Sequence, residues 1–135
     1  MRIATVGALV IGILFVAAPV RAHHSFAAEY DVNKPLTLKG TITKIEFVNP
    51  HAWLYIDVKD PNGKVVNWAV EMGTPHMLIR RGFTKASVPA GTAITVDGYA
   101  AKDGSTTING TTLKLPDGTQ LFTGSPGAPG AEPPK

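Results

Sequence analysis

Alternating apolar and polar residues predict a series of β-strands between residues 36 and 122. Every even-numbered residue from 52 to 58 is apolar, and the same phase returns over 66–72 after the turn sequence Asp60-Pro61-Asn62-Gly63. These two stretches therefore form a predicted hairpin. The preceding strand, 36–47, changes phase from even to odd positions, which requires a bulge or a sharp bend, and Gly40 permits one.

A short helix is predicted after the third strand. Thr74 is a typical N-cap, Pro75 suits the first helical position, and Gly82 is placed to end the helix. Further strands are predicted over residues 93–99, 106–115 and 119–122. We therefore predict a mostly β OB-fold, which is a small and partly open β-barrel. The predicted elements follow its order: three strands, a short helix and two or three further strands. A β-sandwich is the alternative, but it would have more strands and no helix in mid-chain.

The first 22 residues predict a cleaved secretory signal. Arg2 supplies a positive start, and the uncharged run 3–18 is shorter than the roughly 20 residues of a membrane-spanning helix. The residues up to Ala22 form a suitable cleavage site, although an uncleaved anchor is the alternative. We therefore expect a bacterial periplasmic or secreted protein that begins at His23 and has no stable membrane insertion after cleavage.

The mature chain divides into three predicted parts. Residues 23–35 form an extended segment and 36–122 form the barrel. Residues 123–135 are rich in Gly, Pro, Ala and Ser, which predicts a disordered tail.

Composition and charge narrow the range of partners. Arg2 and Arg21 leave with the signal, so the 13 basic residues become 11 against 10 acidic ones, and the mature chain is nearly neutral. No basic cluster is larger than Arg80-Arg81, so we expect no nucleic-acid partner. The chain has no cysteine, which excludes disulfides and thiolate metal ligands. A periplasmic protein or a small ligand is the expected partner.

Two histidines would open the mature chain and could chelate a metal. The α-amine and the ring Nδ1 of His23 form one chelate, because a metal can displace the amine proton at neutral pH. His24 offers a second chelate through amine, backbone amide and imidazole. With His51 as a third nitrogen ligand the site becomes T-shaped, which suits Cu(II). Zn(II) is the alternative, with Glu71 as an oxygen ligand.

These ligands could converge at one rim of the predicted barrel, where the first strand ends, the second begins and the third ends. His51, Glu71 and His76 are expected there. The dozen residues of segment 23–35 span roughly 40 Å when extended, which is enough to bring His23 to the rim. As the alternative, His51 stabilises its own loop and His76 simply belongs to the first helical turn.

Aromatic residues give a second candidate site. Trp53 and Tyr55 share the outward face of the second strand with His51, and OB-folds commonly bind ligands on strands two and three and on the adjoining loops. With Asn49 and His76 from the rim, they could hold a planar ligand, a sugar or a peptide. Alternatively, other segments cover these aromatic rings as a minor core.

No catalytic residues are predicted. No serine lies in a nucleophile-elbow context, and the carboxylates are too scattered to name an acid–base pair. The sequence therefore favours a binding protein, either a copper carrier or accessory protein or a module that binds a peptide, an envelope component or a small molecule. An enzyme with a mononuclear copper site would need an open coordination position, and no sequence feature argues for turnover.

Several motifs together are similar to those of DUF6152, a family of small exported bacterial proteins with no established activity. They are His23-His24-Ser25-Phe26-Ala27-Ala28-Glu29-Tyr30-Asp31, Leu38-Lys39-Gly40, Val48-Asn49-Pro50-His51-Ala52-Trp53, Trp68-Ala69-Val70-Glu71, and Leu78 with Arg80, Arg81 and Gly82. The resemblance covers nearly the whole mature domain and implies export and one compact domain. At the position of His76 the family more often has another residue, so the resemblance supports His23, His24, His51 and Glu71 above His76.

Overall fold

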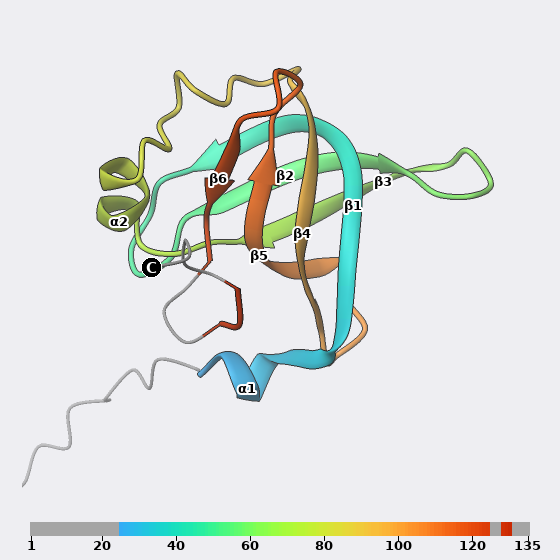
Figure 1. The fold of residues 1–135 in the computed structure, drawn as a ribbon. Coiled ribbons are helices and arrows are strands. Elements are labelled where there is room, and N and C mark those ends of the chain that lie inside the picture. Colours follow the sequence, from blue (N-terminus) through green and yellow to red (C-terminus); the bar gives the residue numbers. More distant parts are fainter. Residues whose placement is uncertain (1–24, 125–127, 131–135) are drawn as a thin grey trace, which may run out of the picture.

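The computed structural model describes residues 25–124 and 128–130, and it confirms the mostly β fold with one short helix between the third and fourth strands (Figure 1). The described elements are α1 (Phe26–Glu29), β1 (Tyr30–Glu46), β2 (Trp53–Lys59), β3 (Val65–Glu71), α2 (Pro75–Arg80), β4 (Ala93–Ala101), β5 (Thr107–Lys114) and β6 (Gln120–Phe122).

The strands form one sheet that curls into a partly open barrel. Their order is β3-β2-β1-β4-β5-β6, with antiparallel neighbours, and β3 also pairs in parallel with β5. This last pairing joins the two ends of the sheet, but it is short and runs only from Ala69 opposite Thr107 to Glu71 opposite Asn109. A five-stranded ring joined in this way is the arrangement of the OB-fold.

β1 belongs to both halves of the barrel and bends between them (Figure 1). It begins at Tyr30 rather than at Leu36, and its first part pairs with β4 while its last part pairs with β2. The predicted irregularity is present, but the register shift lies between Ile42 and Lys44. Gly40 has another role: a Cβ atom there would lie 2.5 Å from the carbonyl oxygen of Asp57, so only glycine allows β1 and β2 to approach this closely.

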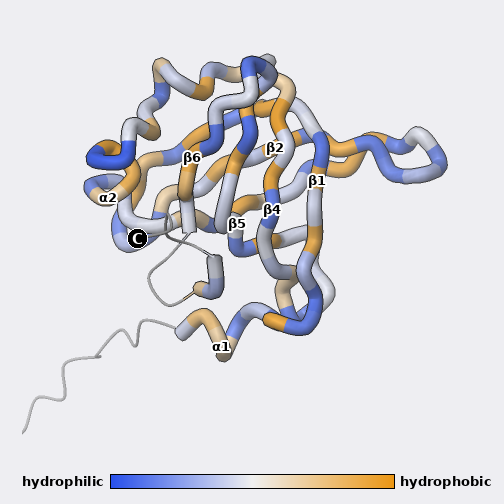
Figure 2. Tube along the Cα trace, viewed as in Figure 1, coloured by the Kyte–Doolittle hydropathy of each residue, from blue (hydrophilic) through white to orange (hydrophobic). Residues whose placement is uncertain are grey.

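The core fills the inside of the ring, as the alternation predicts. The even-numbered residues Leu54 and Ile56 of β2 are fully buried, as is Val70 of β3. Figure 2 shows the resulting alternation of hydrophobic and hydrophilic positions along the strands.

α2 forms as its cap residues predict and adds to the core. Thr74 Oγ1 accepts a hydrogen bond from the Met77 N–H at 3.3 Å, and Gly82 follows the helix with a positive φ of 83°. Leu78 of α2 and Phe83 after it are fully buried in the core cluster.

β6 ends at Phe122, and the residue that follows it is also held by the barrel. Thr123 is buried, its N–H donates to the Thr111 carbonyl at 2.9 Å, and its carbonyl accepts from the Gly73 N–H at 2.8 Å. The predicted signal, His23, His24 and the tail residues 125–127 and 131–135 lie outside the described residues. Within the described ranges, no helix is long and apolar enough to cross a membrane.

Gly40→Ala should lower the free energy of unfolding by about 1–3 kcal/mol, because the added methyl group meets the β2 backbone at Asp57. The neighbouring substitution Thr41→Ala, at an exposed side chain, is the control and should change it by no more than about 0.5 kcal/mol. Urea denaturation of the two variants measures the difference. Equal stabilities would contradict the close approach at Gly40.

Candidate functional site

The predicted rim exists, and a cavity opens beside it. Glu46 of β1 pairs with Trp53 of β2, which pairs with Glu71 of β3, so the three strand ends lie side by side. The cavity has a volume of about 980 Å³ and is lined by Trp53, Glu71, the β1–β2 loop, the β4–β5 loop and the junction of α1 with β1. OB-folds bind ligands with the same strands and the same two loops.

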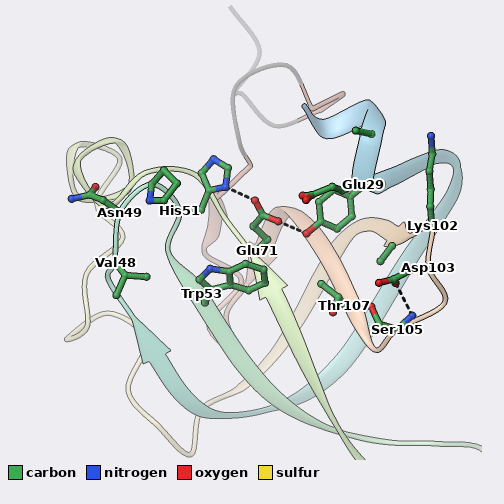
Figure 3. A pocket seen from close by; sticks show the side chains of 14 residues that line it. Glu29, Val48, Asn49, His51, Trp53, Glu71, Lys102, Asp103, Ser105 and Thr107 are labelled. Carbon is green, nitrogen blue, oxygen red and sulfur yellow. Dashed lines mark hydrogen bonds and ion pairs between the residues drawn. The ribbon is translucent and has the colours of Figure 1, made fainter. Parts of the chain in front are cut away.

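A buried carboxylate at the centre of the cavity joins two other side chains (Figure 3). Glu71 is only 5% exposed. Its Oε1 contacts Nδ1 of His51, and its Oε2 accepts a hydrogen bond from the hydroxyl of Tyr30. The expected meeting of His51 and Glu71 is therefore found, and Tyr30 is a third member that the sequence did not suggest.

This arrangement fixes the chemistry of His51. An ionised carboxylate only accepts hydrogen bonds, so the Nδ1 that contacts Glu71 carries a proton, and in the neutral form of the ring Nε2 then has the lone pair. No described residue hydrogen-bonds Nε2. A histidine held by a carboxylate in this way is the usual form of a metal-binding imidazole, in which the carboxylate orients the ring. Both oxygens of Glu71 are already engaged by His51 and Tyr30.

Tyr30 lies in a negative environment. Burial is the main cause that raises the pKa of its hydroxyl well above the usual range, followed by the hydrogen bond to Glu71 and by the negative charges of Glu71, Glu29 and Asp103. Tyr30 therefore stays neutral at ordinary pH and donates its proton to the Glu71 carboxylate.

α1 is held beside this site from two directions. The ring of Phe26 stacks on Tyr30, with 5.8 Å between ring centroids, and meets Tyr99 edge-on at 5.5 Å. The backbone N–H of Lys102 donates to the Glu29 carbonyl at 2.9 Å, and its Nζ donates to the Ala27 carbonyl at 2.6 Å. The chain therefore enters the barrel along the edge of the cavity.

The other predicted site residues lie at different places. Trp53 is half-buried in the cavity wall, and Asn49 lines the cavity from the β1–β2 loop, where its peptide bond to Pro50 is cis. Tyr55 lies outside the cavity lining, and its hydroxyl donates to Glu46 at 3.3 Å. His76 is exposed on α2 and also lies outside the lining.

The metal prediction rests partly on residues that are not described. Within 25–124 and 128–130, no three His, Asp or Glu side chains are grouped so that they could hold a metal ion. His51 therefore needs ligands from elsewhere, and the predicted ones, His23 and His24, lie outside these ranges.

The fold and the site define a small OB-like β-barrel protein with a cavity at one rim and a carboxylate-oriented histidine in its wall. The chain belongs to a family of unknown function, DUF6152, whose model matches residues 11–111. This match confirms the resemblance seen in the motifs and includes Tyr30, His51 and Glu71. No curated protein and no solved structure matches the chain.

The raised pKa of Tyr30 predicts a loss of stability in alkali. Above about pH 10 the unfolded chain releases the Tyr30 proton while the folded protein retains it, so the free energy of unfolding falls as pH rises. Tyr30→Phe should be less stable at neutral pH by about 1–3 kcal/mol, because the buried Glu71 loses a donor. It should also lose less additional stability than the wild type above about pH 10.

Urea denaturation of both proteins at several pH values tests this, with tyrosinate absorbance as a second measure of the ionisation. Parallel pH profiles for the wild type and Tyr30→Phe would contradict the assignment.

Proposed function

We propose that this protein is an exported copper-binding protein that acts as a carrier or accessory protein in the bacterial periplasm. The metal is held by the mature amino-terminal His23 and by Nε2 of His51. One observation carries the proposal: the buried Glu71 contacts Nδ1 of His51, a residue that lines the cavity, and no described residue hydrogen-bonds the other ring nitrogen, Nε2.

The path of the chain supports a site shared by the two histidines. Ala28, Glu29 and Tyr30 line the same cavity as His51. His23 is two residues before Ser25, the first described residue, and two extended residues span about 7 Å. The segment that leads into β1 therefore passes beside the cavity that His51 lines, which supports His23 as a second ligand.

The proposed ligands suit Cu(II). The α-amine and ring nitrogen of His23, together with His51, supply three nitrogen atoms, and His24 assists through its backbone amide or imidazole. We assign Glu71 to orienting His51 rather than to binding the metal, because Tyr30 and His51 already engage both of its oxygens. Zn(II) is the alternative metal for the same nitrogen atoms.

Calorimetry with Cu(II) on protein purified from the periplasm with its native terminus tests the proposal. We expect one tight site, at least about tenfold weaker when a residue is added before His23 or when His51 is replaced by Ala. His76→Ala is the control and should bind copper normally, because His76 is exposed outside the cavity lining. No binding by the processed protein, or binding unchanged by the added residue, contradicts the proposed site.

Glu71→Gln tests whether the Glu71 carboxylate supports copper binding. Loss of a carboxylate that orients a metal-binding histidine weakens metal affinity by roughly 10–100-fold, and we expect this effect on copper. Glu46→Gln is the matched control. Glu46 also pairs with Trp53 across the sheet, but its carboxylate contacts Lys44 and Tyr55 instead of His51. Equal copper affinities of the two variants would exclude a role for Glu71.

A second candidate function, binding of an organic ligand, is favoured by the size of the cavity. Its volume of about 980 Å³ far exceeds the space needed for one metal ion, and the indole of Trp53 forms part of its wall. Sites for small molecules usually enclose roughly 300–1,000 Å³ and combine aromatic walls with a few polar groups.

A further inference from the structure

α1 is attached to the barrel although it adds nothing to the core. None of its four residues is buried, and Phe26 lies outside the core cluster. Even so, the barrel holds the helix along its whole length, through the Phe26 ring at its start and through the backbone carbonyls of Ala27 and Glu29. These attachments therefore fix where the segment lies rather than complete the core.

The ring of Phe26 lies against two tyrosines from different strands. It stacks on Tyr30 of β1 with 23° between the ring planes, and it meets Tyr99 of β4 edge-on with 80° between the planes. Stacked and edge-on contacts are both favoured arrangements of aromatic rings. Contacts with two strands at once leave the start of α1 little freedom to move relative to the barrel.

The β4–β5 loop holds the same segment through Lys102 (Figure 3). Its N–H donates to the Glu29 carbonyl at 2.9 Å, and its Nζ donates to the Ala27 carbonyl at 2.6 Å. Tyr30 and Lys102 also line the cavity. We call Phe26, Tyr30, Tyr99 and Lys102 the clasp, because together they hold the amino-terminal segment beside the cavity wall.

The clasp bears directly on a metal site whose ligands come from two separate segments. His23 lies three residues before Phe26, whereas His51 lies in the β1–β2 loop and is held there by Glu71. When two ligands are held near each other in advance, the second binds the metal as an intramolecular group at a high effective concentration. Glu71 supplies this pre-organisation for His51, and the clasp supplies it for the amino terminus.

We propose that the clasp joins the two halves of the copper site, with Phe26 as its positioning residue, so that undocking of α1 separates His23 from His51 and releases the metal. This inference rests on the proposed copper function and adds its regulation. A carrier must release its metal, and a four-residue helix with no buried residue opens more readily than the barrel core. Glu71 and His51 remain in contact when α1 opens.

A double-mutant cycle with Phe26→Ala and His51→Ala, followed by Cu(II) calorimetry on the processed protein, tests the inference. We expect each single variant to bind copper at least about tenfold more weakly than the wild type. The double variant should be no more than about twofold weaker still, because His51 helps only while the clasp holds His23 beside it. Val32→Ala is the control and should bind normally, because Val32 is 49% exposed on β1 and lies outside the cavity lining.

Nitrogen NMR of the metal-free Phe26→Ala protein separates a loose segment from a damaged site. The proton on Nδ1 of His51 should be retained, because Glu71 still holds the ring. Loss of that proton would overturn the inference, since Phe26 would then act on His51 through the barrel.

A tenfold effect of His51→Ala that persists in the Phe26→Ala background would also overturn the inference, while leaving the copper site in place. No effect of His51→Ala in the wild type would instead contradict the copper site itself, and with it the role of the clasp.

Discussion

The burial of Glu71 is the constraint on which the site depends. A carboxylate removed from water is costly unless hydrogen bonds compensate it, and in this protein the compensation comes from Tyr30 and His51. These donors belong to the start of β1 and to the β1–β2 loop, whereas Glu71 ends β3. One side chain therefore ties together three segments that are distant in sequence, and it fixes the orientation of the histidine that faces the cavity.

The barrel explains why these segments meet. β1 bends around the ring, so its start lies beside β4 and its end lies beside β2, and Gly40 permits the close approach of β1 and β2 at Asp57. β3 closes the ring against β5 over a short stretch that includes Glu71. The start of this long strand and the loop that follows its end thereby line one cavity.

Much of the fold could be predicted from the sequence, because it rests on local patterns. The alternation in β2 and β3, the turn at Asp60–Gly63 and the Thr74 cap each depend on neighbouring residues, and the order of elements then indicates the barrel. The meeting of His51 with Glu71 also followed, because the topology alone places their strand ends together.

The missed features depend on contacts between distant residues. Tyr30 reaches Glu71 across 41 positions, and no spacing in the sequence signals that contact. The position of the register shift in β1 and the burial of Thr123 likewise depend on pairing with other strands. Export and copper binding remain predictions, because the residues that carry them, 1–24, lie outside the described ranges.

The protonation of the His51 ring tests the central claim most directly. Nitrogen NMR of the metal-free protein, at a pH where the imidazole is neutral, distinguishes the protonated ring nitrogen from the one with a lone pair. A proton on Nδ1 and a lone pair on Nε2 is the predicted result, and it should be lost in Glu71→Ala. A wild-type ring with the proton on Nε2 would contradict the account, because the ring nitrogen that Glu71 does not hold would then be unable to bind a metal.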